Sequence, residues 1–208
     1  MQLWDALLGK NAVLQTIKKR RSTRVFLDKQ VPDEDIDALL QAANQAPSAH
    51  NQQSWRFIVI KGKKKSELVN LITDKAAQLP KTSSVLLRMA SRSIQEAPVV
   101  IAISNSGELM KRGGERFKLN KNISHDFFRT MEIQSSAAAV QNLLLAATSL
   151  DIGAVWLGIL FLIKDDVLEF LEEPKGEFMA VVPVGYASKE MKGPKKRGLE
   201  AVVKRFED

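Results

Sequence analysis

The spacing of apolar residues along the chain predicts a series of helices separated by strands. Apolar positions three and four apart mark amphipathic helices, whereas short, nearly continuous apolar runs bounded by proline, glycine or polar residues mark strands. The pattern predicts helices at residues 11–20, 31–43, 66–78, 81–94, 130–150 and 164–171, and strands at residues 55–60, 97–104, 152–157 and 178–186. Because helical segments separate the strands, the predicted fold class is α+β, with a central mixed β-sheet flanked by helices.

The same periodicity predicts which side chains face the core. The helix at 130–150 is the most regular, and the small residues at 135–139 beside its apolar stripe would let another element approach closely. We expect such a contact, surrounded by Leu143, Leu144 and Leu145, to bury a surface that a monomer would expose. In the two helices between residues 66 and 94, the positions predicted to be buried are Leu68, Leu71, Ile72, Val85, Leu86 and Met89.

Residues 105–129 fit neither period. The segment holds Gly107, Gly113, Gly114 and many charged residues, so we expect a long excursion that is either a lid over a binding site or a disordered insertion. The chain has no internal repeat and no long linker, which predicts a single domain over residues 1–208. Within that domain, residues 187–208 form a basic tail without a core pattern.

Composition removes several classes of protein. With 45% hydrophobic and 26% charged residues, the chain of 208 residues suits a compact globular domain. The absence of cysteine excludes disulfides and thiolate ligands, and His50 and His125 are too few for a multi-histidine centre, so no metal site is predicted. The apolar stretch at 155–163 is far shorter than a membrane span. Without an export signal in the first ten residues, we expect a cytoplasmic protein with no membrane partner.

The net charge of +7, from 31 Lys and Arg against 24 Asp and Glu, raises nucleic acid as a partner. The basic residues fall into three short clusters, at 18–24, 61–65 and 189–205, without the aromatic pattern of RNA-binding modules or a zinc-finger spacing. We therefore predict no nucleic-acid partner. A small anionic ligand would use two of the clusters brought together in space, and the cluster at 61–65 is interpreted as solvated surface.

Sequence motifs of the common enzyme classes are missing. The chain contains no G-x-G-x-x-G, G-x-x-x-x-G-K-[ST], G-x-S-x-G or H-E-x-x-H. Three polar segments remain that periodicity does not explain, at 20–24, 46–55 and 193–197. The first is rich in arginine and suits phosphate, because guanidinium groups bind oxyanions bidentately. The second carries amide and imidazole groups that can bond the edge of a heterocycle, and the third is a short basic run held by a proline.

Taken together, these segments resemble the nitroreductase family. The motifs that carry the resemblance are Arg-Arg-Ser-x-Arg at 20–24, Ala-Pro-Ser-x-x-Asn-x-Gln-x-Trp at 46–55, Ala-Val-Gln-Asn-Leu-Leu-Leu-Ala-Ala at 139–147, Gly-Tyr-Ala at 185–187 and Pro-Lys-Lys-Arg at 194–197. Their order covers nearly the whole chain. The resemblance implies an intertwined homodimer that binds FMN, takes hydride from NADH or NADPH, and reduces a nitroaromatic, a quinone or a similar small planar acceptor by a ping-pong mechanism.

The resemblance also assigns roles to residues. It places Arg20, Arg21, Ser22 and Arg24 on the phosphate and pyrimidine side of the flavin, and Val155, Trp156, Leu157 and Gly158 along its reactive edge. Lys195 and Arg197 would complete the phosphate site from the tail. The residues implied to reach the flavin from the neighbouring subunit are Pro47, Ser48, His50, Asn51 and Gln53. No catalytic side chain is implied, because the flavin carries the hydride.

Two features depart from the family pattern. Ser54 stands where many members have proline, and residues 105–129 match no family motif. We expect this segment to cover the flavin, with Phe117, Phe127 and Phe128 stacking on the acceptor. Two alternatives stay open: a specialised reductive dehalogenase or flavin-consuming enzyme on the same fold, and a non-enzymatic protein that binds nucleic acid or another anion.

Overall fold

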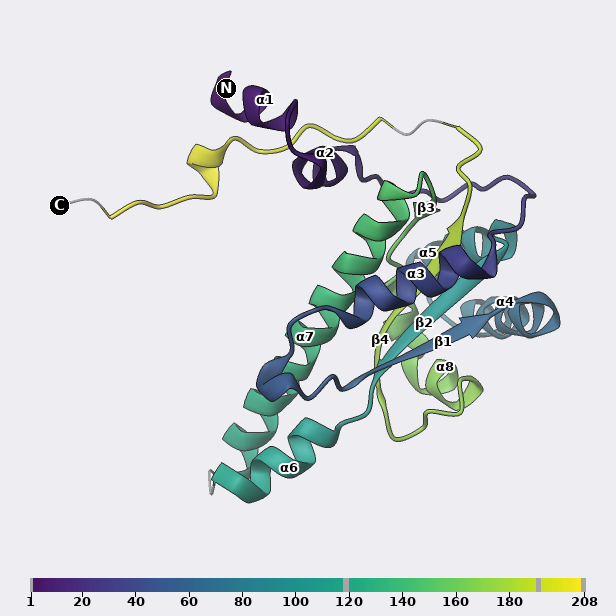
Figure 1. The fold of residues 1–208 in the computed structure, drawn as a ribbon. Coiled ribbons are helices and arrows are strands. Elements are labelled where there is room, and N and C mark those ends of the chain that lie inside the picture. The colour runs from purple at the N-terminus through teal and green to yellow at the C-terminus, as the bar shows by residue number, and fades with distance from the viewer. Residues whose placement is uncertain (1, 118–119, 190–191, 207–208) are drawn as a thin grey trace.

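The computed structural model, which describes residues 2–117, 120–189 and 192–206, contains one four-stranded sheet (Figure 1). The strands are β1 (Trp55–Ile60), β2 (Val99–Asn105), β3 (Gly153–Ala154) and β4 (Glu177–Gly185), in the order β1-β2-β4-β3. All three strand pairs are antiparallel. The parallel component of the predicted mixed sheet is a single bridge between Ser22 and Ala154.

Helices cover both faces of this sheet, so the α+β class is confirmed. They are α1 (Gln2–Leu8), α2 (Ala12–Lys19), α3 (Asp33–Asn44), α4 (Gly62–Ala77), α5 (Lys81–Glu96), α6 (Glu108–Phe117), α7 (Lys121–Ser149) and α8 (Lys164–Phe170), with short 3-10 turns η1 (Ala49–Asn51), η2 (Ile159–Ile163) and η3 (Leu199–Ala201). In Figure 1, α3 and α7 lie on one side of the sheet and α4, α5 and α8 on the other.

Strand β2 shows why its sequence is continuously apolar. Successive side chains of a strand point to opposite faces. Val99, Ile101 and Ile103 pack with α3 and α7, whereas Val100 and Ala102 pack with α4, α5 and α8. Both faces of β2 are therefore buried, and alternation of polar and apolar residues is absent from it.

Two predicted elements differ in length. The strand expected at 152–157 pairs regularly only over β3, and Leu157 rejoins the sheet through an isolated bridge to Val181. The helix expected from residue 130 begins nine residues earlier, at Lys121. The stripe was predicted at Ile133, Ala137, Val140, Leu144 and Ala147. The last three are buried as predicted, and the first two are half-buried.

The prediction for the inner face of α5 was wrong. Val85, Leu86 and Met89 are 49%, 49% and 53% exposed. The buried large side chains of α5 are instead Leu87 and Ile94, which pack with the buried residues of α4. Small residues lie beside them, and the hydroxyls of Thr73 and Ser91 are 3.3 Å apart where the two helices meet. On α4, Leu68 and Ile72 are buried as predicted and Leu71 is half-buried.

Residues 105–129 start at the last residue of β2 and are helical over Glu108–Phe117 and again from Lys121 onward. They form α6 and the first turns of α7, so the excursion is neither irregular nor disordered there. The Phe128 side chain is fully buried against Gly113, and its ring meets that of Phe127 edge-on, with 5.1 Å between centroids. Phe128 is therefore a core residue. The side chain of Phe117 and residues 118–119 lie outside the described part.

The expected exposed surface on α7 was also wrong in part. Leu143 and Leu144 are only 0% and 6% exposed within one chain, because they pack on α3 and the sheet. Exposed apolar side chains lie instead on α2 and on the C-terminal arm, residues 192–206, which runs past α1 and away from the sheet (Figure 1). No helix in the described part of the chain has the length and apolarity to cross a membrane.

Candidate functional site

The arginine segment, residues 20–24, is fixed between α2 and β3. The N–H of Thr23 donates to the carbonyl of Ala154 at 3.0 Å, which holds the segment along β3. A Cβ at Gly153 would lie only 2.8 Å from the Thr23 side chain, so this close approach requires glycine. Arg21 folds back, and its Nη1 donates to the carbonyls of Lys18 and Arg20 at 2.6 and 2.8 Å. That arrangement satisfies carbonyls left free at the end of α2.

A cavity of about 800 Å³, here called the arginine cavity, opens beside this segment. The segment contributes Arg20, Arg21, Ser22 and Arg24 to the lining. The remaining lining residues are Trp4, Ile17, Lys18, Gln141, Lys192, Gly193, Pro194 and Lys196. Two basic clusters from opposite ends of the chain therefore meet. Six of the lining side chains are cationic, and none of the described residues that line the cavity is acidic.

The part of the tail that reaches the cavity differs from the two predicted residues. Lys195 and Arg197 are exposed in the arm and are not among the lining residues, whereas Lys192 and Lys196 are. The arm passes close to Arg21 at Gly193, where an added Cβ would lie 2.5 Å from Nε of Arg21. An extended segment without a strand partner has no periodic pattern that marks the side facing a cavity. The sequence therefore could not distinguish Lys192 and Lys196 from Lys195 and Arg197.

A smaller cavity of about 270 Å³, here called the α5 cavity, shares Arg24 with the arginine cavity. Trp156, Leu157 and Gly158 line it as one wall, together with Ile159. The opposite wall comes from α5 and consists of Leu86, Met89, Ala90 and Ser93. The exposed apolar residues of α5 thus face the segment that was expected to border a flavin ring. Val155 is 2% exposed and is not among the lining residues.

The loop at 47–53 has an unusual backbone. His50, Asn51 and Gln53 have φ angles of 53°, 52° and 51°, in the left-handed region that non-glycine residues rarely adopt. Side chains hold this conformation, because Ser135 Oγ accepts from the N–H of Ala49 and Ser48 Oγ from that of Gln53, both at 3.1 Å. Such strain persists only where the surroundings enforce it.

This loop does not reach either cavity of its own chain. None of the predicted residues, Pro47, Ser48, His50, Asn51 and Gln53, lines the arginine cavity or the α5 cavity. In Figure 1 the loop packs against α7 beyond α3, whereas the arginine segment lies near β3 at the other end of α7. One chain therefore brings together two of the three predicted segments.

A buried polar cluster, which the sequence analysis missed, anchors the end of the loop. The fully buried Glu132 of α7 accepts from the N–H of Leu109 at 2.7 Å and from the hydroxyl of Ser54. Burial raises the pKa of the Glu132 carboxyl, and the hydrogen bond from Leu109 partly opposes the shift. The cluster ties the loop to the start of α6. A glutamate within a helix reads as a surface residue from sequence alone.

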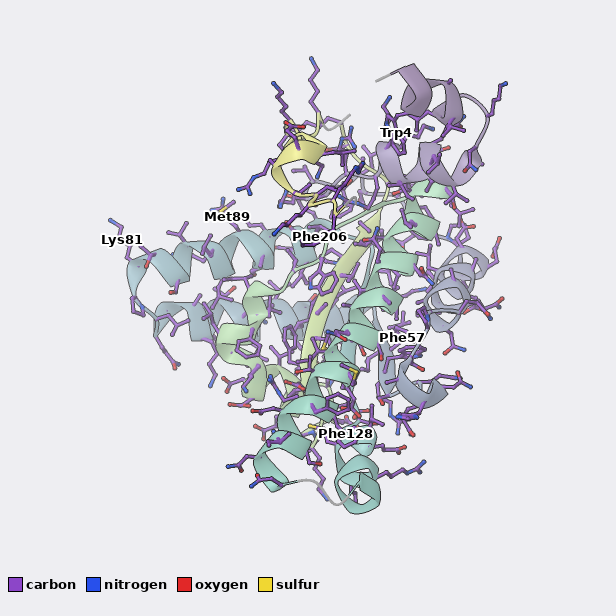
Figure 2. The ribbon with its side chains drawn as sticks, turned by 90° about the vertical axis from the view of Figure 1, so that its left-hand side faces the viewer. Trp4, Phe57, Lys81, Met89, Phe128 and Phe206 are labelled. Atoms are coloured by element: carbon purple, nitrogen blue, oxygen red, sulfur yellow. The ribbon has the colours of Figure 1, made fainter. Side chains whose placement is uncertain are left out.

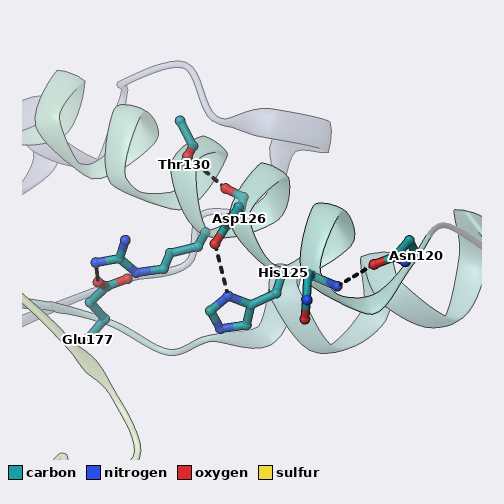
Figure 3. A network of polar contacts seen from close by, with 7 residues as sticks. Asn120, His125, Asp126, Thr130 and Glu177 are labelled. Atoms are coloured by element: carbon teal, nitrogen blue, oxygen red, sulfur yellow. Dashed lines mark hydrogen bonds and ion pairs between the residues drawn. The ribbon is translucent and has the colours of Figure 1, made fainter.

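A neighbouring ion pair joins α7 to the sheet. Glu177, at the start of β4, pairs with Arg129 (Figure 3). Nearby, Ser136 donates to Oδ1 of the buried Asn105. Together with Glu132, these contacts connect α6, α7 and both central strands on the side of the molecule away from the arginine cavity.

Proteins with similar sequences match this chain over most of its length. A protein from Methanothermobacter thermautotrophicus, which carries the inferred name NADH dehydrogenase/NAD(P)H nitroreductase, is 30% identical over 194 residues, covering 88% of this chain and 81% of the relative. Iodotyrosine deiodinase from Hydra vulgaris is 23% identical over 208 residues, with coverage of 92% and 72%.

Solved structures agree with this relationship. A nitroreductase with bound FMN from Bacteroides fragilis superimposes with a TM-score of 0.71 and 27% identity, covering 95% of this chain and all of the other. The sequence model of the Nitroreductase family matches residues 17–186, which include the arginine segment, the strained loop and the whole sheet. The chain therefore belongs to the nitroreductase family.

Proposed function

We propose that this protein is an FMN-dependent oxidoreductase that transfers hydride from NADH or NADPH, through the flavin, to a small planar acceptor by a ping-pong mechanism. The observation that carries the proposal is the set of three guanidinium groups, Arg20, Arg21 and Arg24, in the lining of the arginine cavity, of which Arg24 also lines the α5 cavity. One cavity is suited to a phosphate and the other to an aromatic ring. The FMN-bound family neighbour supports this choice of cofactor.

The residues fit FMN by their chemistry. Arg20 and Arg21 offer guanidinium donors for a phosphate, and charge-assisted bonds of this kind are the strong ones. From the arm, Lys195 and Arg197 are proposed to add two further cations at the phosphate. When bound, FMN supplies the hydride-transfer chemistry. Trp156, Leu157 and Gly158 then border the ring, and Val155 supports this wall from the core.

Arg24 has a separate role in the proposal. Among the described residues it is the one that lines both cavities. A cation at this position favours negative charge on a reduced ring system, because a preorganised positive group stabilises charge as it develops. The lining thus explains how a site without an acid, base or nucleophile could promote reduction.

We further propose that the loop at 47–53 completes the site of a second copy, so that the protein is a homodimer. The loop is strained and rich in polar groups, yet it faces neither cavity of its own chain. Unpartnered apolar surface supports the same assembly. Val13 of α2 is 63% exposed beside a groove of about 460 Å³ between α2, α3 and α7, and Phe206 of the arm is 87% exposed.

Flavin binding and reduction test the proposed function. Protein purified with FMN should be yellow, release FMN on denaturation, and bleach anaerobically when NADH or NADPH is added. Reoxidation by a panel of nitroaromatics and quinones should then restore the colour. A colourless preparation that takes up no FMN and instead shifts DNA would contradict the proposal and favour an anion-binding protein.

Mixed dimers test the shared site. Arg24→Ala and Asn51→Ala chains should each bind FMN poorly alone, because every site in either homodimer carries a damaged residue. Their heterodimer should recover one intact site, since both defects then fall in the other site. If co-expressed, separately tagged chains bind no more FMN than either parent variant, the two segments do not form a site between subunits.

A reductive dehalogenase is the second candidate. The likeness to iodotyrosine deiodinase favours it over other members of the fold. Halogenated phenols should then reoxidise the reduced protein and release halide, which an ion-selective electrode measures. Reoxidation by nitroaromatics without halide release would leave the first candidate in place.

A further inference from the structure

The arginine cavity has a wall that lies outside the family match. Trp4 comes from α1, and Lys192 and Lys196 come from the arm, whereas the match covers residues 17–186. Helix α1 is held on α2 by the buried Leu8, whose carbonyl accepts from Nε2 of Gln15 at 2.9 Å. Trp4 is four residues before Leu8 and therefore lies on the same face of the helix. Its side chain is 46% exposed, so an aromatic surface remains available (Figure 2).

The charge of the cavity exceeds what one FMN molecule requires. A phosphate monoester carries about two negative charges at neutral pH. The arginine segment alone provides three guanidinium groups, Arg20, Arg21 and Arg24. Lys192 and Lys196 add two further cations, and no described lining residue is acidic. Concentrated positive charge of this kind attracts a ligand that carries another phosphate.

Lys192 and Lys196 lie on the stretch of the arm that passes beside the arginine segment. At Gly193 the chain comes so close to Arg21 that an added Cβ would lie 2.5 Å from Nε, and the Arg21 side chain would have to shift. Lys192 and Pro194 flank this contact, and Lys196 follows within the same extended stretch. The two ammonium groups are therefore carried directly beside the arginines. Trp4 lines the same cavity from the other chain end.

We propose that this wall is a subsite for the adenosine end of NADPH, with the 2′-phosphate on Lys192 and Lys196 and the adenine ring against Trp4. NADH lacks the 2′-phosphate, so the subsite makes NADPH the preferred hydride donor. Ammonium groups bind phosphate as point charges, and indole presents a broad face for stacking. The inference rests on the proposed function and adds to it the choice between the two donors.

Binding of adenosine phosphates to the FMN-loaded protein tests the two lysines without turnover. In calorimetry, 2′,5′-ADP should bind at least about tenfold more tightly than 5′-AMP, because hydrogen bonds to charged groups are the strongest of the ordinary ones. The Lys192→Ala/Lys196→Ala variant should lose that preference and keep its FMN. A Lys63→Ala/Lys81→Ala variant removes the same charge from exposed residues that do not line the cavity, and it should retain the preference. Lys81 lies far from Trp4 in Figure 2.

Replacing Trp4 should change the affinities of the two adenosine phosphates in a different way from replacing the lysines. Because adenine is common to both probes, Trp4→Ala should weaken 2′,5′-ADP and 5′-AMP by the same factor, and Trp4→Phe should restore most of the binding. Quenching of indole fluorescence by 5′-AMP should disappear in Trp4→Phe. Unchanged affinities and unchanged quenching in both Trp4 variants would remove this residue from the subsite.

The outcomes separate the subsite from the proposed function. Equal affinity of the wild-type protein for 2′,5′-ADP and 5′-AMP, with FMN bound and reducible by NADH, would overturn the subsite alone. Loss of FMN from the Lys192→Ala/Lys196→Ala variant would also overturn it, by assigning both lysines to the flavin phosphate. Failure to bind FMN in the wild-type protein would overturn the proposed function itself.

Discussion

Replacing Phe128 by alanine tests whether α6 is packed structure or a cover that opens over the site. The Phe128 ring is fully buried and lies against Gly113 of α6, where even a Cβ would come within 2.5 Å of the ring. The neighbouring Phe127 is 49% exposed and meets Phe128 edge-on. The two phenylalanines are adjacent in the chain, so each serves as the control for the other.

The expected losses differ several-fold. Truncating a buried phenylalanine removes its transfer free energy and leaves a cavity, which together amount to about 3–5 kcal/mol. Phe127→Ala loses an edge-on ring contact of about 0.5–1.5 kcal/mol and little buried area. Because the free energy of unfolding of a typical protein is about 5–15 kcal/mol, the Phe128→Ala protein should still fold.

Urea denaturation at one fixed protein concentration measures both losses, with the m-value as a check that the unfolding transition is unchanged. Hydrogen exchange should show α6 opening more often in Phe128→Ala than in Phe127→Ala. A loss below about 1 kcal/mol for Phe128→Ala, or equal losses for the two variants, would show that the ring is not packed as described.

Three further predictions concern the site and its support. Arg20→Ala combined with Lys195→Ala should weaken FMN binding by several kcal/mol, at about 1.5–3 per charge-assisted bond, while circular dichroism stays unchanged; a double variant with wild-type FMN content would refute the phosphate assignment. The raised pKa of Glu132 means that the folded state holds its proton at pH values where the unfolded chain has lost it. The free energy of unfolding should therefore fall as pH rises from the ordinary pKa of a glutamate through the raised pKa of Glu132 in the folded state. In thermal unfolding, Glu132→Gln should make stability less dependent on pH; an unchanged dependence would exclude Glu132 as its source. Met89→Ala should widen the α5 cavity and raise kcat/KM for bulkier acceptors relative to single-ring ones, with FMN content unchanged; an unaltered acceptor ranking would exclude this wall from acceptor binding.

The sequence predicted the layered core well because burial leaves a period in the chain. Strand β2 and the stripe of α7 are examples, since each apolar position there has a partner on a predictable face. The prediction from this period chose the wrong face of α5. Leu87 and Ile94 are its buried large residues, beside small ones such as Ser91, and the three residues predicted to be buried face outwards. The prediction also missed α6, because Gly113 was taken as a sign of irregular structure. This glycine is required by close contact with the Phe128 ring and does not mark a turn.

The candidate site was predictable as far as it follows local motifs. The arginine segment lines the cavity as a group, because α2 and β3 fix it on both sides. For the tail, the sequence predicted the right segment but not the right residues. Lys192 and Lys196 line the cavity, whereas Lys195 and Arg197 do not. The contribution of Trp4 depends on how α1 docks on α2, which no motif encodes.

The edge strand β1 bears on how the protein behaves once it is damaged. It pairs with β2 along all six residues and stands at one end of the sheet. The backbone donors and acceptors on its other side therefore have no strand partner among the described residues. Val59 is 40% exposed on this strand, and only Arg56 offers a charge against pairing with another sheet. Mild heating should therefore lead to β-rich aggregates seeded at this edge, and a lysine in place of Val59 is the simplest change to delay them.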